Sequence, residues 1–306
     1  MSEKENKVIS ASPKVRKLAR EFGANIYKIK GSERLGRVSE NDVKYYIKEN
    51  LSKKNIDQDN NINKEQKYDH SEFGEIEIKS IPRLKKIARS HLVKSWTEIP
   101  HVTQHDEADI TEMEDFRLSL RDTYTGEKIK ITPLAFIMRA LVKALKDLPL
   151  FNSSLDIKND KIIYKKYFHI GVAVDTPHGL MVPKIRNVET KDINTLAKEL
   201  KEVSNKCKNL KIDKKEFYGG SMTISSLGSI GGSFFTPIIN FPEVSILGIG
   251  RAEAKQVFMD GKFQKRIMLP LSLSYDHRII DGAEGARFCS YLKDILGKDF
   301  AYKLAV

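Results

Sequence analysis

A short polar stretch between a strand pattern and a helix pattern constrains this chain more than any other feature. Residues 269–275 alternate as a strand does, and residues 283–296 place apolar side chains at the spacing of a helix with one buried face. His277, Asp281 and Gly282 fall between the two patterns. A strand-to-helix junction holds polar side chains rigidly and leaves them open to a ligand. A histidine four residues before a carboxylate is by itself more often a structural pair, so the rest of the chain must decide.

The sequence from residue 71 to residue 306 mixes strand and helix patterns and predicts one α/β domain. Strands are expected at 71–78, 99–109, 162–167, 170–174, 221–226 and 244–250, and helices at 82–96, 133–147 and 190–208. The helix at 133–147 is the most apolar and should be central to the core. Thr111 and Glu114 predict a capping box at the start of a further helix.

A separate small all-α domain is predicted over residues 7–50. Ser12 and Pro13 are typical of a helix start, Gly23 of a helix end, and Ser39 of a second helix start. This segment holds 11 Lys and Arg against 5 Asp and Glu, so it carries +6 of the net charge of +12. Two helices of this size are marginal in stability. We therefore expect a docking module for an acidic partner.

The segments on either side of this module are strongly polar. Residues 1–6 are predicted to be disordered, and residues 51–70 to form a flexible linker.

Several classes of protein are disfavoured by composition. No apolar run approaches the roughly 18 residues of a membrane span, and the first residues show neither a secretion nor an import pattern. Cys207 and Cys289 are the only cysteines, which predicts no disulfide framework, no metal site and a reducing compartment, the cytoplasm. Because half of the positive charge lies in one small domain, a nucleic-acid binder is a distant alternative.

The extended string 274–282 resembles the active-site segment of the dihydrolipoamide acyltransferases, the core subunits of 2-oxo acid dehydrogenase complexes. Chloramphenicol acetyltransferase shares its shorter His-x-x-x-Asp-Gly part. Further resemblances to the acyltransferases occur in order at 99–103, 151–155, 171–175, 219–228 and 235–240. They are most similar to the acetyltransferase of bacterial pyruvate dehydrogenase complexes. The resemblance implies a chloramphenicol-acetyltransferase-like sheet-and-helix domain over residues 71–306 that forms homotrimers and, from these, a cubic core of 24 subunits.

The basic segment 7–50 resembles the peripheral subunit-binding domain of the same family. That resemblance implies docking to dihydrolipoamide dehydrogenase, or to the pyruvate decarboxylase subunit, through basic side chains. The matching positions are Arg16, Lys17, Arg20 and Arg37. Arg16 and Arg20 share one helix face, which suits an acidic partner surface. Glu33 departs from the family pattern.

The implied reaction transfers an acetyl group between the sulfur of dihydrolipoamide and the thiol of coenzyme A. A histidine suits general-base removal of the thiol proton at neutral pH, and that role goes to His277. A hydroxyl donor for the oxyanion intermediate is needed as well. The family position for it is Ser225, although the residues alone do not choose among Ser225, Ser226 and Thr223. In the family, the histidine of one subunit meets the serine of its neighbour.

Three further positions complete the expected site. Asp281 either orients the imidazole or structures the turn, two roles of about equal weight. Asp175 and Arg278 are expected to form an ion pair that shapes the site. The other strand histidines, His101 and His105, are expected to be ordinary surface or hydrogen-bonded residues, as are two at 169 and 178.

The acyl group and the source of lipoate stay open. No lipoyl-domain pattern occurs in this sequence, so lipoate is expected from a lipoyl domain outside it, with coenzyme A as the other substrate. The alternatives are a succinyl or branched-chain acyltransferase, a scaffold subunit without activity, which should lack His277, and a small-molecule acetyltransferase, for which a docking domain makes no sense.

Overall fold

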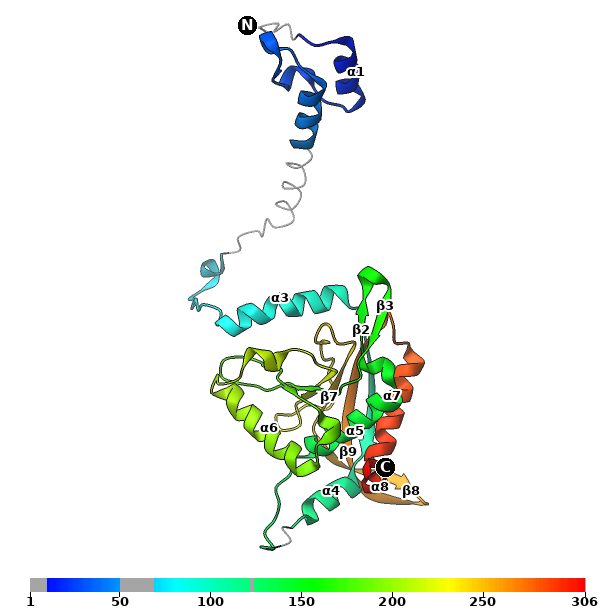
Figure 1. Ribbon diagram of the computed structural model, residues 1–306. Helices are drawn as coiled ribbons and strands as arrows, with labels where there is room; N and C mark the ends of the chain where they lie inside the picture. The colour runs from blue at the N-terminus through cyan, green and yellow to red at the C-terminus, as the bar shows by residue number, and fades with distance from the viewer. Residues whose placement is uncertain (1–9, 50–68, 122–123, 306) are drawn as a thin grey trace. The chain divides into compact units, whose positions relative to one another are not determined.

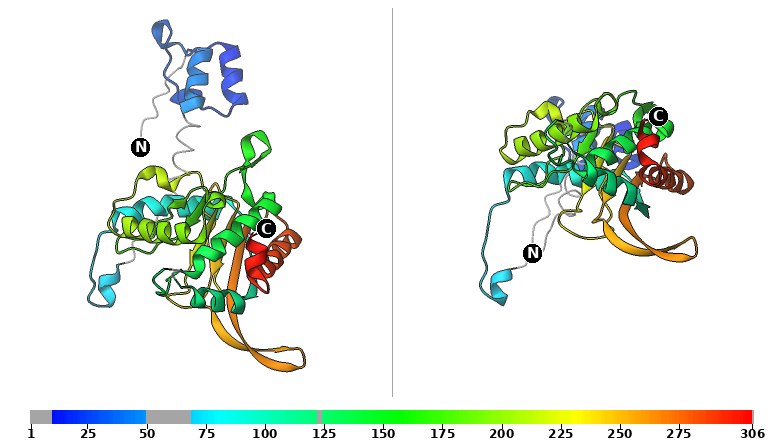
Figure 2. Two further views of the ribbon diagram at one scale, coloured as in Figure 1. Left: turned by 60° about the horizontal axis from the view of Figure 1, so that its bottom comes forward. Right: turned by 90° about the horizontal axis from the view of Figure 1, so that it is seen from below.

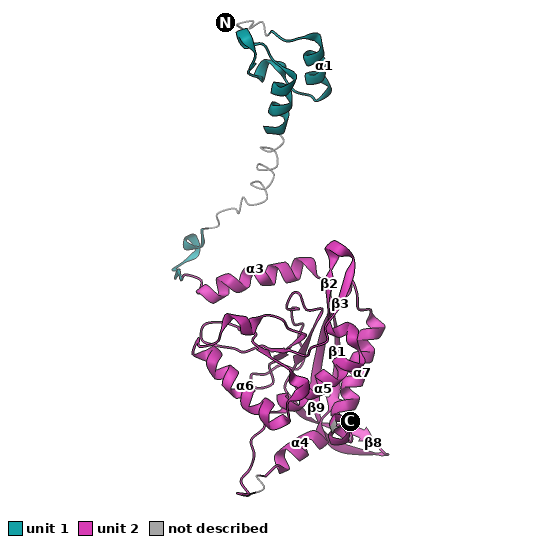
Figure 3. Ribbon diagram, viewed as in Figure 1, with its two compact units in different colours: residues 1–79 teal, residues 80–306 magenta. Residues whose placement is uncertain are grey.

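The computed structural model describes residues 10–49, 69–121 and 124–305. It divides into two compact units, residues 1–79 and 80–306 (Figures 1 and 3). The disorder predicted for residues 1–6 lies outside the described residues, as does nearly all of the linker predicted for 51–70.

The small unit is built from two helices joined by short turns. Helix α1 (Pro13–Glu21) begins where predicted, because the Ser12 hydroxyl accepts a hydrogen bond from the Val15 amide. Gly23 then ends it with a backbone φ of +64°. The 3-10 turns η1 (Ile26–Lys28) and η2 (Arg34–Gly36) lead to a second helix that covers 40–49. The fully buried core consists of Val15, Ala19, Ile29, Val38 and Val43.

Asp42 ties the loop of the small unit to its second helix. The Asp42 carboxylate accepts hydrogen bonds from the backbone amides of Ser39 and Ser32, and the Ser39 hydroxyl accepts one from the Asp42 amide. The two backbone donors, Ser39 first, lower the pKa of Asp42 to about 2. One acidic side chain therefore stabilises the basic module from inside.

The large unit contains a mixed seven-stranded sheet. Its order is β1–β9–β7–β6–β4–β5, with β8 paired to the first half of β9. The strands are β1 (His101–Asp109), β4 (Ile170–Val172), β5 (Lys184–Ile185), β6 (Met222–Ser226), β7 (Ser245–Ile249), β8 (Glu253–Met259) and β9 (Lys262–Asp276). A separate hairpin pairs β2 (Ser153–Asp156) with β3 (Lys161–Tyr164). The last half of β9 is buried and lies between β1 and β7.

Helices pack on the sheet around α5 (Pro133–Asp147), which Thr132 caps as predicted. α5 contacts both α6 (Ile193–Lys208) and α7 (Gly282–Leu296), and nine of its side chains are buried. The remaining helices are α3 (Arg83–Glu98), α4 (Thr111–Ser119) and α8 (Phe300–Ala305). Figure 2 shows the β8–β9 hairpin extending away from these helices. The α/β class predicted from the sequence is therefore confirmed, whereas β2, β5, β8 and α8 were not predicted.

The strand predicted at 71–78 is wrong. Residues His70–Phe73 form a 3-10 turn, η3, and residues 74–79 lie in no regular element. Every side chain in 70–79 is exposed, and the described part of the chain offers no strand that pairs with it. Alternation marks a strand only when a second strand supplies the hydrogen bonds.

Helix α3 is present, but its apolar stripe is not in a packed core. Only Ser95 of this helix is buried, and Ile87 is 60% exposed. Four side chains of this stripe, Leu84, Ile87, Ala88 and His91, line a cavity instead. The capping box expected at Thr111 is also absent, because the Thr111 hydroxyl donates to Asp109 and Glu114 pairs with Arg117.

Candidate active site

His277 follows the last residue of β9 and stands at the end of the sheet. Its backbone amide donates to the carbonyl of Pro100, 3.1 Å away, which anchors the turn to the start of β1. The residue is exposed, and its ring centroid lies 6.0 Å from that of Tyr275. No hydrogen bond of the imidazole is found within the described residues. Both ring nitrogens are thus open to a substrate, as a general base requires.

Asp281 has a structural role that the geometry shows directly. It is the N-cap of α7: its Oδ1 accepts from the Glu284 amide at 2.8 Å, and the Glu284 carboxylate accepts from the Asp281 amide at 2.9 Å. This capping box fixes where the helix starts, and so fixes the turn that carries His277. Of the two roles left open for Asp281, these contacts fit the structural one.

The ion pair expected between Asp175 and Arg278 is not formed within the chain. The Arg278 guanidinium instead binds Asp276, with Nη2 2.6 Å from Oδ2 and Nε 2.9 Å from Oδ1. Asp276 is buried, and Asp175 is exposed. The two-residue spacing of Asp276 and Arg278 lets the planar guanidinium take both carboxylate oxygens, which the sequence interpretation missed. Asp276 and Pro100 are thus further residues that shape the turn.

The structure separates Thr223 from the other two hydroxyl candidates of β6. Thr223 and Ser225 lie on one face of the strand, and Ser226 lies on the other. The Thr223 hydroxyl is fully buried and donates to Glu243 at 2.6 Å. Ser225 is half-buried, and no hydrogen bond of its side chain is found among the described residues. Ser225 is therefore the hydroxyl on this face that is available to a ligand.

Strand register shows how far Ser225 and His277 lie from each other in one chain. Ser225 pairs with Gly248 of β7, and Gly248 pairs with Ser272 of β9. His277 is five residues beyond Ser272, a distance of about 17 Å along the strand. One small reacting group cannot contact both side chains of the same chain. A site that uses both must take them from two copies.

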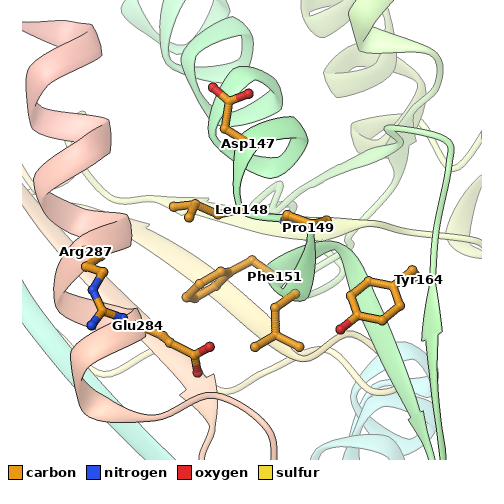
Figure 4. A pocket seen from close by; sticks show the side chains of 8 residues that line it. Asp147, Leu148, Pro149, Phe151, Tyr164, Glu284 and Arg287 are labelled. Carbon is orange, nitrogen blue, oxygen red and sulfur yellow. The ribbon is translucent and has the colours of Figure 1, made fainter.

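Two hollows lie elsewhere in the large unit. One, of about 760 Å³, lies under α3 and is lined mostly by apolar side chains, with Lys184, Asn240 and Glu243 among its polar ones. The other, of about 300 Å³, lies between α7 and β3 (Figure 4), where Arg287 and Tyr164 face each other across Phe151. None of the predicted catalytic residues lines either hollow.

The predicted docking residues of the small unit are available to a partner. Lys17, Arg20 and Arg37 are exposed, and Arg16 is half-buried with its Nε donating to the Ala11 carbonyl. Among the described residues no ion pair holds Arg20 or Arg37. On α1, Lys14 lies 2.7 Å from Glu40 and Lys17 lies 3.9 Å from Glu21, so the positive charge of this helix is partly compensated.

Other chemically active side chains have ordinary roles. His101 and His105 are hydrogen-bonded strand residues as predicted, to the Ile239 amide and the Ser272 hydroxyl. Cys207 and Cys289 are free and buried, and burial raises the pKa of the Cys289 thiol to about 12. Over the described ranges, no cluster of metal ligands is found and no helix is long and apolar enough to cross a membrane.

Family models match both units of this chain. The catalytic domain of the 2-oxoacid dehydrogenase acyltransferases matches residues 74–301, and the e3 binding domain matches residues 9–44. The chain belongs to the 2-oxoacid dehydrogenase acyltransferase family. The resemblance that carried the sequence interpretation is therefore confirmed.

Individual relatives of this chain agree with the family match. It is 43% identical over 301 residues, 95% of its length, to the dihydrolipoyllysine-residue acetyltransferase component of the pyruvate dehydrogenase complex of Cupriavidus necator, of which it covers 54%. The same component of Haemophilus influenzae is 45% identical, with 94% of this chain and 53% of that one covered. The chain thus spans about half the length of these curated relatives.

Solved structures show the same fold for the large unit. The dihydrolipoamide acetyltransferase of Azotobacter vinelandii superposes with a TM-score of 0.74 at 48% identity, over 78% of this chain and 97% of that one. A probable dihydrolipoamide acetyltransferase from Listeria monocytogenes gives a TM-score of 0.68 at 32% identity, over 74% and 97%.

Proposed function

We propose that this chain is the dihydrolipoyllysine-residue acetyltransferase of a pyruvate dehydrogenase complex, acting in the bacterial cytoplasm. It would transfer an acetyl group between dihydrolipoyl sulfur and coenzyme A. The observation that carries the proposal is that a chain of this family has both a serine without a side-chain partner, Ser225, and an exposed histidine, His277, at a fixed distance along the sequence. Curated relatives with this name support the acetyl group over succinyl or branched-chain groups.

The spacing of Ser225 and His277 along the sequence also occurs in a solved relative. The Azotobacter vinelandii enzyme has been studied crystallographically and enzymatically for the roles of a serine, a histidine and an asparagine in its catalytic mechanism. There the serine precedes the histidine by 52 positions, and the asparagine follows the histidine by four. Ser225 precedes His277 by the same 52 positions, and Asp281 follows by four. This chain has aspartate where that enzyme has asparagine.

In the proposed mechanism His277 acts as general base. It takes the proton from the thiol of coenzyme A, and the thiolate attacks the carbonyl carbon of the acetyl-dihydrolipoyl thioester. The carbonyl oxygen becomes an oxyanion, to which the Ser225 hydroxyl donates a hydrogen bond. When the tetrahedral intermediate collapses, the carbon–sulfur bond to the dihydrolipoyl group breaks. The leaving thiolate takes the proton from His277, so the enzyme returns unchanged.

The separation of Ser225 and His277 supports an oligomer as the active form. A cyclic trimer would bring the histidine of each copy to the serine of the next. The solved cubic core of a pyruvate dehydrogenase multienzyme complex, 48% identical to this chain, supports further assembly of trimers into a core of 24 subunits. Lipoate would arrive on a lipoyl domain of the complex.

The small unit would recruit a peripheral enzyme. Its match to the e3 binding domain supports dihydrolipoamide dehydrogenase as the partner. We propose that Arg16, Lys17, Arg20 and Arg37 face acidic groups on that partner, because the unit carries a net charge of +6 over residues 7–50. The pyruvate decarboxylase subunit is the other candidate for the same surface.

Acetyl transfer from acetyl-coenzyme A to free dihydrolipoamide tests this function, because a free acceptor does not depend on any lipoyl domain. We expect His277→Ala to lower kcat by about 10³-fold or more, and Ser225→Ala by about 10²-fold. Neither change should alter the melting temperature, since both side chains are without partners among the described residues. A well-folded wild type that transfers no acetyl group would contradict the proposal, and succinyl- and isobutyryl-coenzyme A would then be tried.

A further inference from the structure

A fully buried ion pair lies in the large unit, at the strands that lead to Ser225. The Lys184 ammonium is 2.5 Å from Oε1 of Glu243, and each side chain is at most 2% exposed. The Thr223 hydroxyl joins the pair: it accepts from Lys184 at 3.2 Å and donates to Oε2 of Glu243 at 2.6 Å. Asn240 donates to Oε1 as well, at 3.1 Å. These four residues are called the Lys184 cluster.

The backbone leaves space for this cluster at two glycines. Lys184, Gly171 and Thr223 are paired in one row across β5, β4 and β6, so the lysine side chain crosses over Gly171 to reach Thr223. A Cβ atom at Gly171 would lie 2.6 Å from the ammonium. A Cβ atom at Gly220 would lie 2.2 Å from the Glu243 carboxylate. Both contacts are too short for any side chain, so the cluster occupies space that only glycine provides.

Stability alone does not account for such an arrangement. A buried ion pair contributes little compared with apolar side chains of the same volume, because both charges must leave water. What the pair does provide is a fixed orientation of the hydrogen bonds around it, because each carboxylate oxygen of Glu243 accepts from defined donors. The cluster connects β5, β6 and the turn just before β7. These are the strands whose mutual register places Ser225.

We propose that Lys184 and Glu243 are positioning residues for Ser225, acting through the hydroxyl of Thr223. Thr223 lies two residues before Ser225 on the same face of β6. Because Glu243 holds Thr223, β6 cannot shift or rotate at the position of Ser225. The inference rests on the proposed function, because it assumes that Ser225 serves the acetyl-transfer reaction.

The charge of Lys184 is needed to keep the hydrogen bonds in this direction. Without the Lys184 ammonium, Oε1 of Glu243 would lose its charged donor, and the buried carboxylate would be poorly satisfied. The Glu243 side chain would then turn toward other donors, and Thr223 would lose its fixed acceptor. Displacement of a reacting group by about 1 Å is enough to lower a rate by about 10²-fold.

A double-mutant cycle between the cluster and Ser225 tests the proposal. The cluster is changed by Thr223→Val, which keeps the shape and removes the hydroxyl, and by Lys184→Met with Glu243→Gln, which removes both charges together. In the full chain we expect each change to lower kcat by about 10- to 100-fold, with KM for acetyl-coenzyme A unchanged. Thr223→Ser should recover most of the lost kcat. In a Ser225→Ala background the same changes should lower kcat by less than about twofold, because their effect passes through the serine.

This inference would be overturned if the cluster changes lowered kcat by the same factor in the Ser225→Ala background as in wild type. Such a result would mean that the cluster supports only the fold. Wild-type kcat in both cluster variants would also overturn it. If Ser225→Ala itself kept the wild-type kcat, the proposed role of the serine would fail as well. Melting temperature and oligomer size, measured for every variant, separate a loss of positioning from a loss of folding.

Discussion

The spacing of Asp281 from His277 marks it as a candidate site residue, but its contacts decide its role. From the sequence, its position four residues after His277 left two roles open, orienting the imidazole or structuring the turn. The carboxylate caps α7, with Oδ1 accepting from the Glu284 amide. Its effect on His277 is therefore through the position of the turn.

Substitutions at Asp281 should therefore depend on capping ability. Asparagine is as good an N-cap as aspartate, so Asp281→Asn should leave kcat within about twofold. Asp281→Ala should destabilise the protein by about 1 kcal/mol. Steady-state kinetics and thermal unfolding would check both. A loss of kcat in Asp281→Asn as large as that in His277→Ala would show that the charge itself takes part in catalysis.

Lys165 is a second residue whose environment sets its behaviour. It donates to the Gly220 carbonyl at 2.9 Å, and burial lowers its pKa to about 8, although attraction to Glu243 opposes the shift. Between about pH 8 and pH 10.5 the unfolded chain then binds more protons than the folded one, so this group makes stability rise with pH. At neutral pH its charge is a cost to the folded state.

Lys165→Met should remove that cost. We expect the variant to be more stable than wild type at pH 7 by about 1–3 kcal/mol, with the advantage disappearing toward pH 10.5. Denaturant unfolding at several pH values measures this. Lys166, an exposed neighbour, provides the matched control, since Lys166→Met should show no such pH dependence. Equal stability differences at both pH values would contradict the argument.

At the scale of elements, residues that repeat with helical spacing and have a cap were predicted well. α1, α5 and α7 begin within one residue of expectation, because Ser12-Pro13 and Thr132-Pro133 specify a helix start locally. The strand predicted at 71–78 was wrong, because alternation does not show whether a partner strand is present for it to pair with. For the same reason the site was predicted only in part: Arg278 was recognised, but its partner Asp276 depends on side-chain direction at the end of β9.

The second helix of the small unit gives an element-scale test. Asp42→Ala removes the acceptor for the Ser39 and Ser32 amides and should destabilise this unit by about 1–2 kcal/mol. Hydrogen exchange of residues 10–49 in the full chain should speed up, while exchange in β9 stays the same. Since the pKa of Asp42 is lowered, its contribution is present above about pH 4 and is lost as the pH falls toward 2. Unchanged protection at pH 7 would show that the loop is held by other contacts.

At the scale of the whole molecule, the separation of His277 from Ser225 makes a quantitative prediction about mixed oligomers. His277→Ala and Ser225→Ala subunits are each expected to be nearly inactive alone. If every site takes its histidine from one copy and its serine from the next, a trimer that contains both variants has one intact site. Random mixing in equal amounts should recover about a quarter of the wild-type activity, since about three quarters of trimers are mixed.

The mixture would be denatured and refolded together, and its activity compared with that of the variants refolded apart and then combined. Recovery in the first sample alone supports sites shared between copies. No recovery, with trimers formed normally, would mean that each copy carries a whole site, contrary to the strand register.

The burial of the two cysteines has a consequence for the proposed reaction, which takes place at sulfur. The disulfide of an oxidised lipoyl group exchanges with an accessible thiolate: the thiolate attacks one sulfur, the other leaves as a thiolate, and a reactive cysteine would be held as a mixed disulfide. Cys207 and Cys289 are both buried, and a thiol with a pKa of about 12 is almost never ionised at neutral pH. Under the proposed function, the buried thiols would therefore not exchange with a lipoyl disulfide that reaches the site. The same burial makes the two thiols internal reporters, which alkylating reagents should label only when the large unit opens.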